Sequence, residues 1–519
     1  MFSLVPISFL TLGVLPSLSQ AKGTTDWKQK CEAFTSLPAI PESINASLTK
    51  VDYYPAGALF NETDPNTSLE STSFKAFCRV QINITTSNTT SAVSEIWLPD
   101  SWSGIFWGTG NGASGGGLNW GDLGYVAVNH GFAGHATNGG HSSNGSSAVA
   151  FENPETLTDW DYRAMHQGTV AGKAITAKYY GKNTFHSYYG ACSAGGRQGW
   201  IEAERFPEDY DSIITGSPAV DDIRHNETWG LVHSEVLRQC DEIDGLKDGI
   251  LSNPQRCNFR PQAIACRPGQ TTGCLTAAQL GVLRYVYEPW VDVNDTYVYA
   301  GFPYGAEAGF ITGNLLADGG EYGQDGDFFR HAIVHNSSWT VDQIDFALVQ
   351  RGVEEIGGPN GDSATNPNIT AFVARGGKMI HYVGWNDQYL SPFASIRWHD
   401  EVDSFMTTNT EYTTTDYYRL FVIPGMKHCG GGEGANFFGQ PSVYTADPVS
   451  LEPSHNVIFS LFDWHQKGKA PDSFIGTAFR DNNISLGVNY ERPICMWPKH
   501  TTYNGHGDPM KASSFSCAL

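Results

Sequence analysis

The chain has 519 residues, of which 40% are hydrophobic and 17% charged, a globular composition at a length that exceeds one ordinary core. Its formal net charge of −22 would repel a phosphate backbone and argues against nucleic acid as a partner. Beyond the N-terminus, no window has the roughly 18 uncharged apolar residues of a membrane-spanning helix, so we expect no membrane partner.

The first 21 residues predict a signal peptide. MFSLVPISFLTLGVLPSLSQA is a short apolar run that ends in a small-x-small cleavage pattern, and Pro6 and Pro16 argue against the alternative of a buried helix. The chain also contains eleven N-x-S/T glycosylation acceptors: Asn45, Asn61, Asn66, Asn83, Asn88, Asn144, Asn226, Asn294, Asn336, Asn368 and Asn483. These features predict a secreted, extracellular glycoprotein.

Strand-like and helix-like segments alternate along much of the chain. Strands are predicted over 91–99, 103–110, 125–131, 186–191 and 212–219, and helices over 161–181 and 196–206. This β-α-β alternation predicts an α/β fold with a mostly parallel sheet and helices on both faces. The pattern breaks in a cysteine- and glycine-rich stretch and resumes with strands that begin near 376 and 417. We therefore predict a catalytic domain over 22–225 and 371–519, interrupted by a lid domain over 226–370.

A glycine-rich loop, GTGNGASGGG, follows the second predicted strand and contains Ser114 in a formal G-x-S-x-G. No helix-like sequence follows this serine, which argues against Ser114 as a nucleophile. The loop also matches G-x-G-x-x-G, but no acidic residue at a following strand end supports dinucleotide binding. The position suits an oxyanion-hole loop instead, with a backbone amide near Gly112 as a donor, and a merely flexible loop remains the alternative.

The stretch SYYGACSAGGRQGW predicts a nucleophile elbow, in which a strand, a tight turn and a helix expose a serine. Ser193 stands at the turn, and small residues follow it where larger side chains would collide with the neighbouring strand and helix. Ala191 replaces the first glycine of the usual pattern, a difference of one methyl group. The backbone N–H of Ala194 would be the second oxyanion donor.

A serine needs a base, and the base needs an acid that orients it. In this type of fold the chain order is serine, acid, histidine, each on a loop after a strand. Asp387 and His428 occupy such positions, in GWNDQYLSP and PGMKHCGGG. His381 lies inside a predicted strand and Asp416 precedes one, so both fit less well; a turn aspartate and a loop histidine are the plainer alternatives.

The ten cysteines are even in number and predict disulfides in a secreted protein, whereas no C-x₂-C pair supports zinc. Short separations favour three local pairs, and the first two cysteines would close the N-terminal region, although spacing does not fix connectivity: Cys240–Cys257, Cys266–Cys274, Cys495–Cys517 and Cys31–Cys78. Cys192 and Cys429 remain, directly beside Ser193 and His428. A disulfide between them would hold the base against the nucleophile.

The combination Cys192-Ser193, Asp387 and His428-Cys429 resembles the CS-D-HC motif of the fungal tannase and feruloyl esterase family, and most of all its type B feruloyl esterases. TNGGH, GGRQG and RFPEDYD extend the resemblance over most of the mature chain. It implies an α/β-hydrolase fold with a large lid, and a serine esterase that hydrolyses aromatic carboxylic esters. Feruloyl esters of plant cell walls are the first expectation. Galloyl esters, as for a tannase, are the second, and an inactive secreted binding glycoprotein is the alternative from another class.

The segment CDEIDGLKDGIL places Asp241, Asp244 and Asp248 among glycines, which suits the oxygen ligands of Ca²⁺ but not an EF-hand. An acidic surface turn is the alternative. The resemblance implies a structural calcium ion held by these carboxylates and by the backbone carbonyls of Leu246 and Ile250.

Overall fold

The computed structural model describes residues 25–143, 148–183, 185–218, 229–291, 297–312, 323–357, 366–443 and 450–519. The predicted signal peptide and the acceptors Asn144, Asn226 and Asn294 lie outside the described residues. The other eight acceptors lie in the described part of the chain, where none is buried and Asn66 and Asn83 are half-buried. None of the helices in these ranges is long and apolar enough to cross a membrane.

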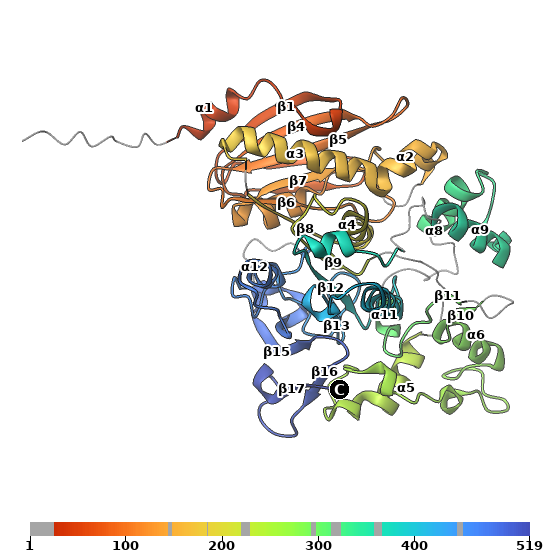
Figure 1. The fold of residues 1–519 in the computed structure, drawn as a ribbon. Helices are drawn as coiled ribbons and strands as arrows, with labels where there is room; N and C mark the ends of the chain where they lie inside the picture. Colours follow the sequence, from red (N-terminus) through yellow and green to blue (C-terminus); the bar gives the residue numbers. More distant parts are fainter. Residues whose placement is uncertain are drawn as a thin grey trace, which may run out of the picture.

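A nine-stranded mixed sheet runs through the molecule (Figure 1). Six neighbouring strands are parallel, and the three at one edge are joined antiparallel. In spatial order the strands are β1 (Ala46–Tyr54), β4 (Phe77–Thr85), β5 (Ser91–Pro99), β7 (Ala133–Thr137), β6 (Ile105–Gly108), β8 (His186–Cys192), β9 (Ser212–Gly216), β12 (Lys378–Gly384) and β13 (Tyr418–Ile423). The predicted α/β class and mostly parallel sheet are confirmed.

Strand alternation divides the interior into two cores, because successive side chains point to opposite faces of a sheet. Tyr189 and Ile213 belong to one core, with residues of α3 (Ala164–Tyr180), α4 (Ala194–Arg205) and α11 (Pro392–Asn409). Their neighbours Tyr188 and Ile214 belong to the other core, with residues of α12 (Val457–Lys467). Both faces of the sheet are therefore covered.

One predicted strand is wrong. Residues 125–131 are not a strand, because most of them continue the π-helix Asp122–Val128, and the strand follows as β7. Asn119 accepts a hydrogen bond from the backbone N–H of Asp122 at the start of this helix, and Gly131 turns the chain out of it with φ +77°. A short buried apolar run fits either a strand or a helix, and burial on nearly all sides removes the periodicity that would distinguish them.

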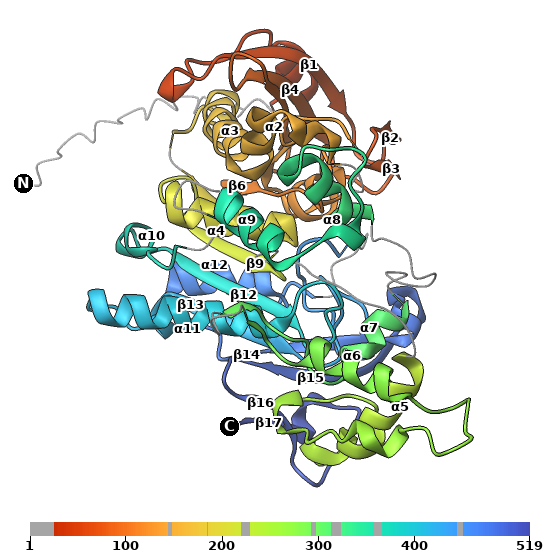
Figure 2. The same ribbon diagram turned by 90° about the vertical axis from the view of Figure 1, so that its right-hand side faces the viewer.

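The described residues between β9 and β12 contribute no strand to the main sheet. The first part of this stretch forms α5 (Trp229–Cys240), α6 (Ala277–Tyr287), β10 (Trp290–Val291), β11 (Tyr297–Tyr299) and α7 (Glu307–Thr312), which share a separate core that reaches Ala394 of α11. Its second part forms α8 (Gly323–Phe328) and α9 (Phe346–Gly357), which Figures 1 and 2 show beside each other. Phe328 and Leu348 of this part pack against a small core that includes Ala194 of α4. α10 (Thr370–Ala374) then leads back to the sheet. The proposed lid boundaries at 226 and 370 stay a prediction.

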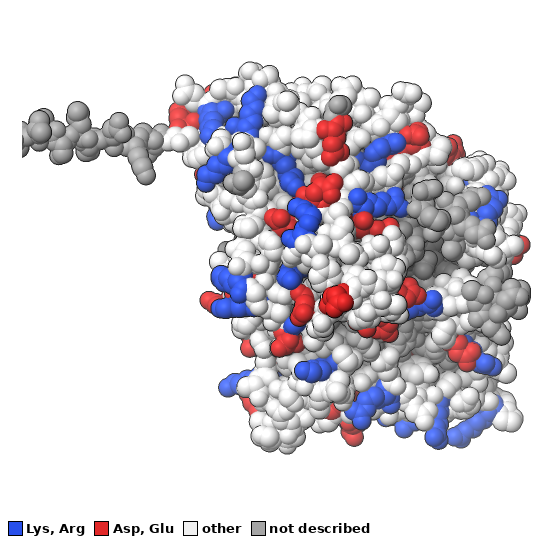
Figure 3. Space-filling view, viewed as in Figure 1, with Lys and Arg blue, Asp and Glu red and all other residues white. Residues whose placement is uncertain are grey.

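The C-terminal part adds two small hairpins, β14 (Ser473–Phe479) with β15 (Val488–Cys495), and β16 (His500–Tyr503) with β17 (Phe515–Ala518). On the face of the molecule drawn in Figure 3, acidic and basic side chains are interspersed.

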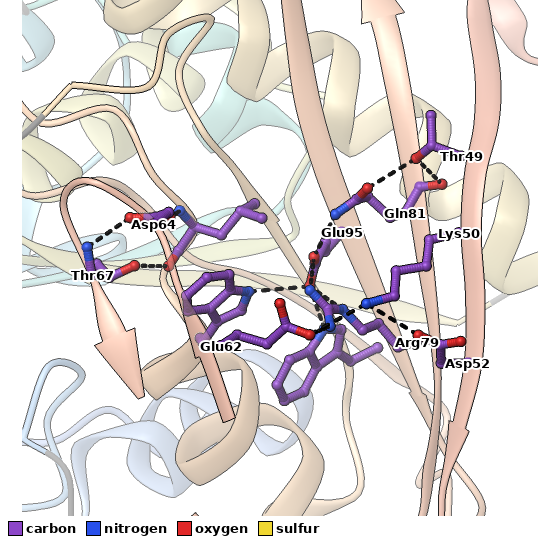
Figure 4. A network of polar contacts seen from close by, with 12 residues as sticks. Thr49, Lys50, Asp52, Glu62, Asp64, Thr67, Arg79, Gln81 and Glu95 are labelled. Atoms are coloured by element: carbon purple, nitrogen blue, oxygen red, sulfur yellow. Dashed lines mark hydrogen bonds and ion pairs between the residues drawn. The ribbon is translucent and has the colours of Figure 1, made fainter. Parts of the chain in front are cut away.

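A buried ionic network fastens the hairpin β2 (Phe60–Thr63) and β3 (Ser68–Ser71) to the antiparallel edge of the sheet (Figure 4). Arg79 of β4 is 1% exposed and donates two hydrogen bonds to the Glu95 carboxylate, at 2.5 and 3.0 Å. It also pairs with Glu62 of β2 at 2.5 Å, and Lys50 joins the same carboxylate at 3.2 Å. One guanidinium therefore neutralises two carboxylates that come from different strands.

Replacing Arg79 by methionine should lower the free energy of unfolding by about 3–5 kcal/mol, because the Glu95 carboxylate would stay buried without its cation. Urea unfolding measures this change. The matched control is Arg284→Met, which removes an exposed pair with Glu288 and should cost no more than about 1 kcal/mol. Equal effects of the two substitutions would contradict a stabilising role for the buried Arg79–Glu95 pair.

Candidate active site

Ser193 lies in the tight turn between β8 and α4, with φ +64° and ψ −129°. A positive φ is strained for a serine, and such strain is typical of a nucleophile elbow. The backbone N–H of Ser193 donates to the carbonyl oxygen of Gly216 in β9 at 2.9 Å, which fixes the turn against the neighbouring strand. The side chain is thus presented at the start of a twelve-residue helix, whose N-terminus favours negative charge.

The small residues after Ser193 are required by close contacts. A Cβ on Gly195 would lie 2.7 Å from the Ala191 side chain and 2.9 Å from the Asn111 carbonyl oxygen, and a Cβ on Gly196 would lie 2.4 Å from the Gly216 carbonyl oxygen. The strand and the helix therefore approach each other closely only because these side chains are absent.

The glycine loop after β6 lies directly against the elbow. A Cβ on Gly110 would lie 2.6 Å from the Cα atom of Gly195, whereas a Cβ on Gly112 would meet nothing within 4 Å. Asn111 and Gln198 of α4 bind each other twice, through the Asn111 backbone N–H at 3.0 Å and through their side-chain amides at 3.1 Å. The loop is therefore held beside the start of α4, where the sequence predicts an oxyanion hole at Ala194 and Gly112.

A second support for this loop comes from the β2–β3 hairpin. Asp64 accepts a hydrogen bond from the Leu118 backbone N–H at 3.1 Å, and the Thr67 hydroxyl donates to the Leu118 carbonyl oxygen at 3.1 Å. The Asn66 side chain occupies the space that a side chain on Gly115 would need. Sequence reasoning missed this contact, because nothing in the local pattern of the hairpin points to the glycine loop.

Asp387 and His428 lie together beyond the carboxyl ends of β12 and β13. The Asp387 carboxylate is fully buried and faces Nδ1 of His428 at 2.9 Å and 3.1 Å. The same carboxylate accepts hydrogen bonds from the backbone N–H groups of Tyr389 and Leu390, both at 3.0 Å. Four contacts thus fix the acid, which can hold the imidazole with Nδ1–H toward the carboxylate.

The neighbours of Asp387 also orient His428. The Gln388 side-chain carbonyl accepts a hydrogen bond from the His428 backbone N–H at 3.2 Å, and the Tyr389 ring packs edge-on against the imidazole at 4.9 Å. Sequence reasoning missed both residues, although they follow the predicted acid directly. His381, the other histidine considered from the sequence, is buried and hydrogen-bonded to Tyr418 and Ser395. Burial lowers the pKa of His381 to about 3.

The disulfide Cys192–Cys429 joins the residue before Ser193 to the residue after His428, with a Cα–Cα distance of 5.9 Å. Cys429 has a left-handed backbone with φ +61°, so the chain turns sharply beside the histidine. The structure also forms Cys31–Cys78, Cys240–Cys257, Cys266–Cys274 and Cys495–Cys517, and it has no free cysteine. Ser193 and His428 are therefore brought into one site from positions far apart in the sequence.

The predicted calcium loop borders a small cavity that it shares with the C-terminal part of the chain. Asp244 and Asp248 line a cavity of ≈ 20 Å³ together with Ile250, Ser252 and residues of the C-terminal hairpins. Burial raises the pKa values of both carboxyls, and each is raised further by neighbouring aspartate charges. Asp241 accepts a hydrogen bond from the Gly249 backbone N–H at 2.9 Å, and Asp248 approaches Arg492 at 3.4 Å. The cavity has room for one small ion and offers two carboxylates to a hard cation, although Arg492 and several apolar side chains also line it.

The sheet, the elbow and the acid–histidine pair define an α/β-hydrolase, a fold class that includes many esterases. A family model described as tannase and feruloyl esterase matches residues 78–232 and 227–518. The chain therefore belongs to the tannase and feruloyl esterase family and is a carboxylic ester hydrolase.

Individual relatives agree with this assignment. The chain is 32% identical to a probable feruloyl esterase B-2 of Aspergillus oryzae over 98% of both chains, and 32% identical to feruloyl esterase B of Aspergillus niger over 98% of this chain and 99% of that one. The crystal structure of feruloyl esterase B from Aspergillus oryzae is similar with a TM-score of 0.85 at 31% identity, covering 95% of this chain and all of that one. Tannin acyl hydrolase from Aspergillus niger shares the fold, with a TM-score of 0.72 at 21% identity over 95% of this chain and 94% of that one.

Replacing Cys192 and Cys429 together by alanine should reduce kcat/KM for a p-nitrophenyl ester by at least about 100-fold, because a displacement of about 1 Å between reacting groups costs that much. The control is the double alanine variant of Cys266 and Cys274. Their disulfide joins two residues only eight positions apart and does not involve the elbow, so this variant should keep its activity. Circular dichroism establishes that both variants are folded. Retention of full activity without Cys192–Cys429 would refute a role for this bridge in the site.

Proposed function

We propose that this protein is a secreted serine esterase that hydrolyses feruloyl and related hydroxycinnamoyl esters of plant cell walls through an acyl-enzyme on Ser193. One observation carries the mechanism: the buried Asp387 carboxylate is bonded to His428, which a disulfide ties to the nucleophile elbow. The names of the similar proteins support the substrate class. The leader-like first 21 residues and the disulfides support secretion.

In the proposed reaction His428 accepts the proton of the Ser193 hydroxyl as the oxygen attacks the ester carbonyl carbon. Asp387 keeps the imidazole in the tautomer with Nδ1–H and stabilises the imidazolium that forms. The backbone N–H groups of Ala194 and of the loop near Gly112 stabilise the oxyanion. His428 then gives its proton to the leaving alcohol, and a water molecule activated by the same imidazole releases the acid from Ser193.

The substrate preference is tested with methyl ferulate, methyl caffeate, methyl p-coumarate, methyl gallate and tannic acid, assayed side by side with the purified full chain. We expect kcat/KM to be higher for the hydroxycinnamates than for the gallates. A preference for the gallates would overturn the substrate class and leave the mechanism intact. No turnover of any ester, with no fluorophosphonate labelling of Ser193, would favour the inactive binding glycoprotein.

Replacing Asp387 by asparagine should lower kcat by on the order of 10⁴-fold while leaving KM nearly unchanged, because the amide would favour the wrong imidazole tautomer. Steady-state kinetics on methyl ferulate measure both constants. The matched control is Asp416→Asn, an acid at the opposite end of the neighbouring strand, which should behave as wild type. A small effect at Asp387 would remove it from the triad.

We further propose that the loop 241–250 holds a structural Ca²⁺ through Asp241, Asp244 and Asp248 and the carbonyl oxygens of Leu246 and Ile250. The ion would neutralise the three neighbouring carboxylates, of which Asp241 is buried, and tie α5 to the C-terminal hairpins, and it would take no part in the reaction. The small cavity and the raised carboxyl pKa values support this site.

Removal of calcium by EGTA should therefore lower the Tm, and added Ca²⁺ should restore it, because an ion that binds only the folded state stabilises it. The shift should be several degrees, on the order of 5 °C, at a calcium concentration about 100 times the Kd. Asp244→Asn should abolish the calcium response. The control Glu242→Gln changes an exposed neighbour that pairs with Lys247, and it should keep the response. A Tm that ignores calcium in the wild type would exclude the site.

A further inference from the structure

A second cluster of ligand-type side chains lies far along α4 from the candidate active site. His166 of α3, Glu202 of α4 and Asp209 in the turn before β9 have ligand atoms that all lie within 4.8 Å of one another. The three residues are 9%, 1% and 2% exposed. Among the described residues, this is the group of three His, Cys, Asp or Glu side chains whose ligand atoms lie this close together. The aspartates of the proposed calcium loop do not belong to it.

The Glu202 carboxylate has no compensating donor in this cluster. Both of its oxygens are buried and accept no hydrogen bond from a described donor, and its neighbour Asp209 is a second carboxylate. Lys173 is near, but its ammonium donates to the backbone carbonyl oxygens of Glu208 and Asp209, at 3.1 and 2.6 Å. A buried carboxylate without donors is costly unless a proton or a cation neutralises it.

Both ring nitrogens of His166 face carboxylates, so an ion that binds at Nδ1 would displace the proton that this nitrogen shares with Asp209. Nδ1 faces Asp209 at 2.6 Å, and Nε2 contacts the half-exposed Glu42 carboxylate at 3.0 Å. Histidines that bind metals usually donate their second ring N–H to a carboxylate, which fixes the tautomer. The imidazole also stacks on Phe206 with 3.7 Å between ring centroids, so its orientation is fixed.

We propose that His166, Glu202 and Asp209 form a binding site for a divalent transition-metal cation such as Zn²⁺, with Glu42 as the outer partner of the histidine. One imidazole nitrogen and two carboxylates are ligands that zinc accepts at about 2.0–2.2 Å. The ion would neutralise two buried carboxylates and join α3, the end of α4 and the turn before β9. Its role is structural, because the cluster lies at the opposite end of α4 from Ser193.

The experiment measures zinc and cobalt binding by the full chain after removal of metals with a chelator and dialysis. Plasma mass spectrometry gives the zinc content, and the visible absorption of bound Co²⁺ reports the ligand environment. Loss of an outer hydrogen-bond partner typically weakens metal binding by about 10- to 100-fold, and we expect Glu42→Gln to weaken zinc binding within that range. Glu202→Gln removes a direct ligand and should weaken zinc binding by more than this. Glu202→Gln is nearly isosteric, and Glu42 is exposed enough to serve as a second variant if the first does not fold.

Two control variants distinguish binding at this cluster from metal binding elsewhere in the protein. Glu204→Gln changes an acid on the same helix outside the cluster, and Asp244→Asn changes the proposed calcium loop; both should leave zinc binding unchanged. Ester hydrolysis by Glu202→Gln should also stay unchanged, so the result does not depend on the proposed function. Equal zinc content in the wild type and Glu202→Gln, or no zinc in either, would overturn the proposal and assign a shared proton to Glu202 and Asp209.

Discussion

The candidate active site is built around the covalent link between Cys192 and Cys429. Without a crosslink, two segments 237 residues apart would be kept together only by packing and by the strand ladders that lie between β8 and β13. Closing a loop of that length in the unfolded chain removes entropy equivalent to about 5 kcal/mol in the chain-entropy model. The larger consequence is local, because the bridge joins the residues directly adjacent to Ser193 and His428. Small shifts between β8 and β13 therefore move both side chains together.

The remaining parts of the site are positioned by successive layers of contacts. Asp387 is held by backbone N–H groups of its own loop, and His428 is held by Asp387 and Gln388. The glycine loop is held from one side by Gln198 and from the other by Asp64. Asp64 in turn belongs to a hairpin that the Arg79 network fastens to the sheet (Figure 4). A buried ion pair at the antiparallel edge thus contributes to the placement of a loop beside the nucleophile.

Local sequence was sufficient for the features that depend on local geometry. A strand, small residues and a helix around Ser193 predict an elbow, because each is needed within a few residues of the turn. Asp387 and His428 were found by their positions after strands. The π-helix Asp122–Val128 was missed because its side chains are buried on nearly all sides, so no periodicity remained. The contacts of Asp64 with Leu118, and of Arg79 with Glu95, join separate segments, and no local pattern records which residues will meet.

The helix α4 connects these observations, because its N-terminal end begins at a strained backbone turn and its C-terminal end carries a buried carboxylate. At its N-terminus Ser193 has a strained backbone, and glycines replace the side chains that would otherwise pack there. That end must therefore be held from outside, by the disulfide and by the Gly216 carbonyl oxygen. At its C-terminal end the helix carries Glu202, a buried carboxylate whose neutralisation would fix it against α3. The two ends of α4 are therefore fixed independently, the turn at Ser193 by a covalent bond and a close backbone approach, and the far end by the contacts around a buried carboxylate.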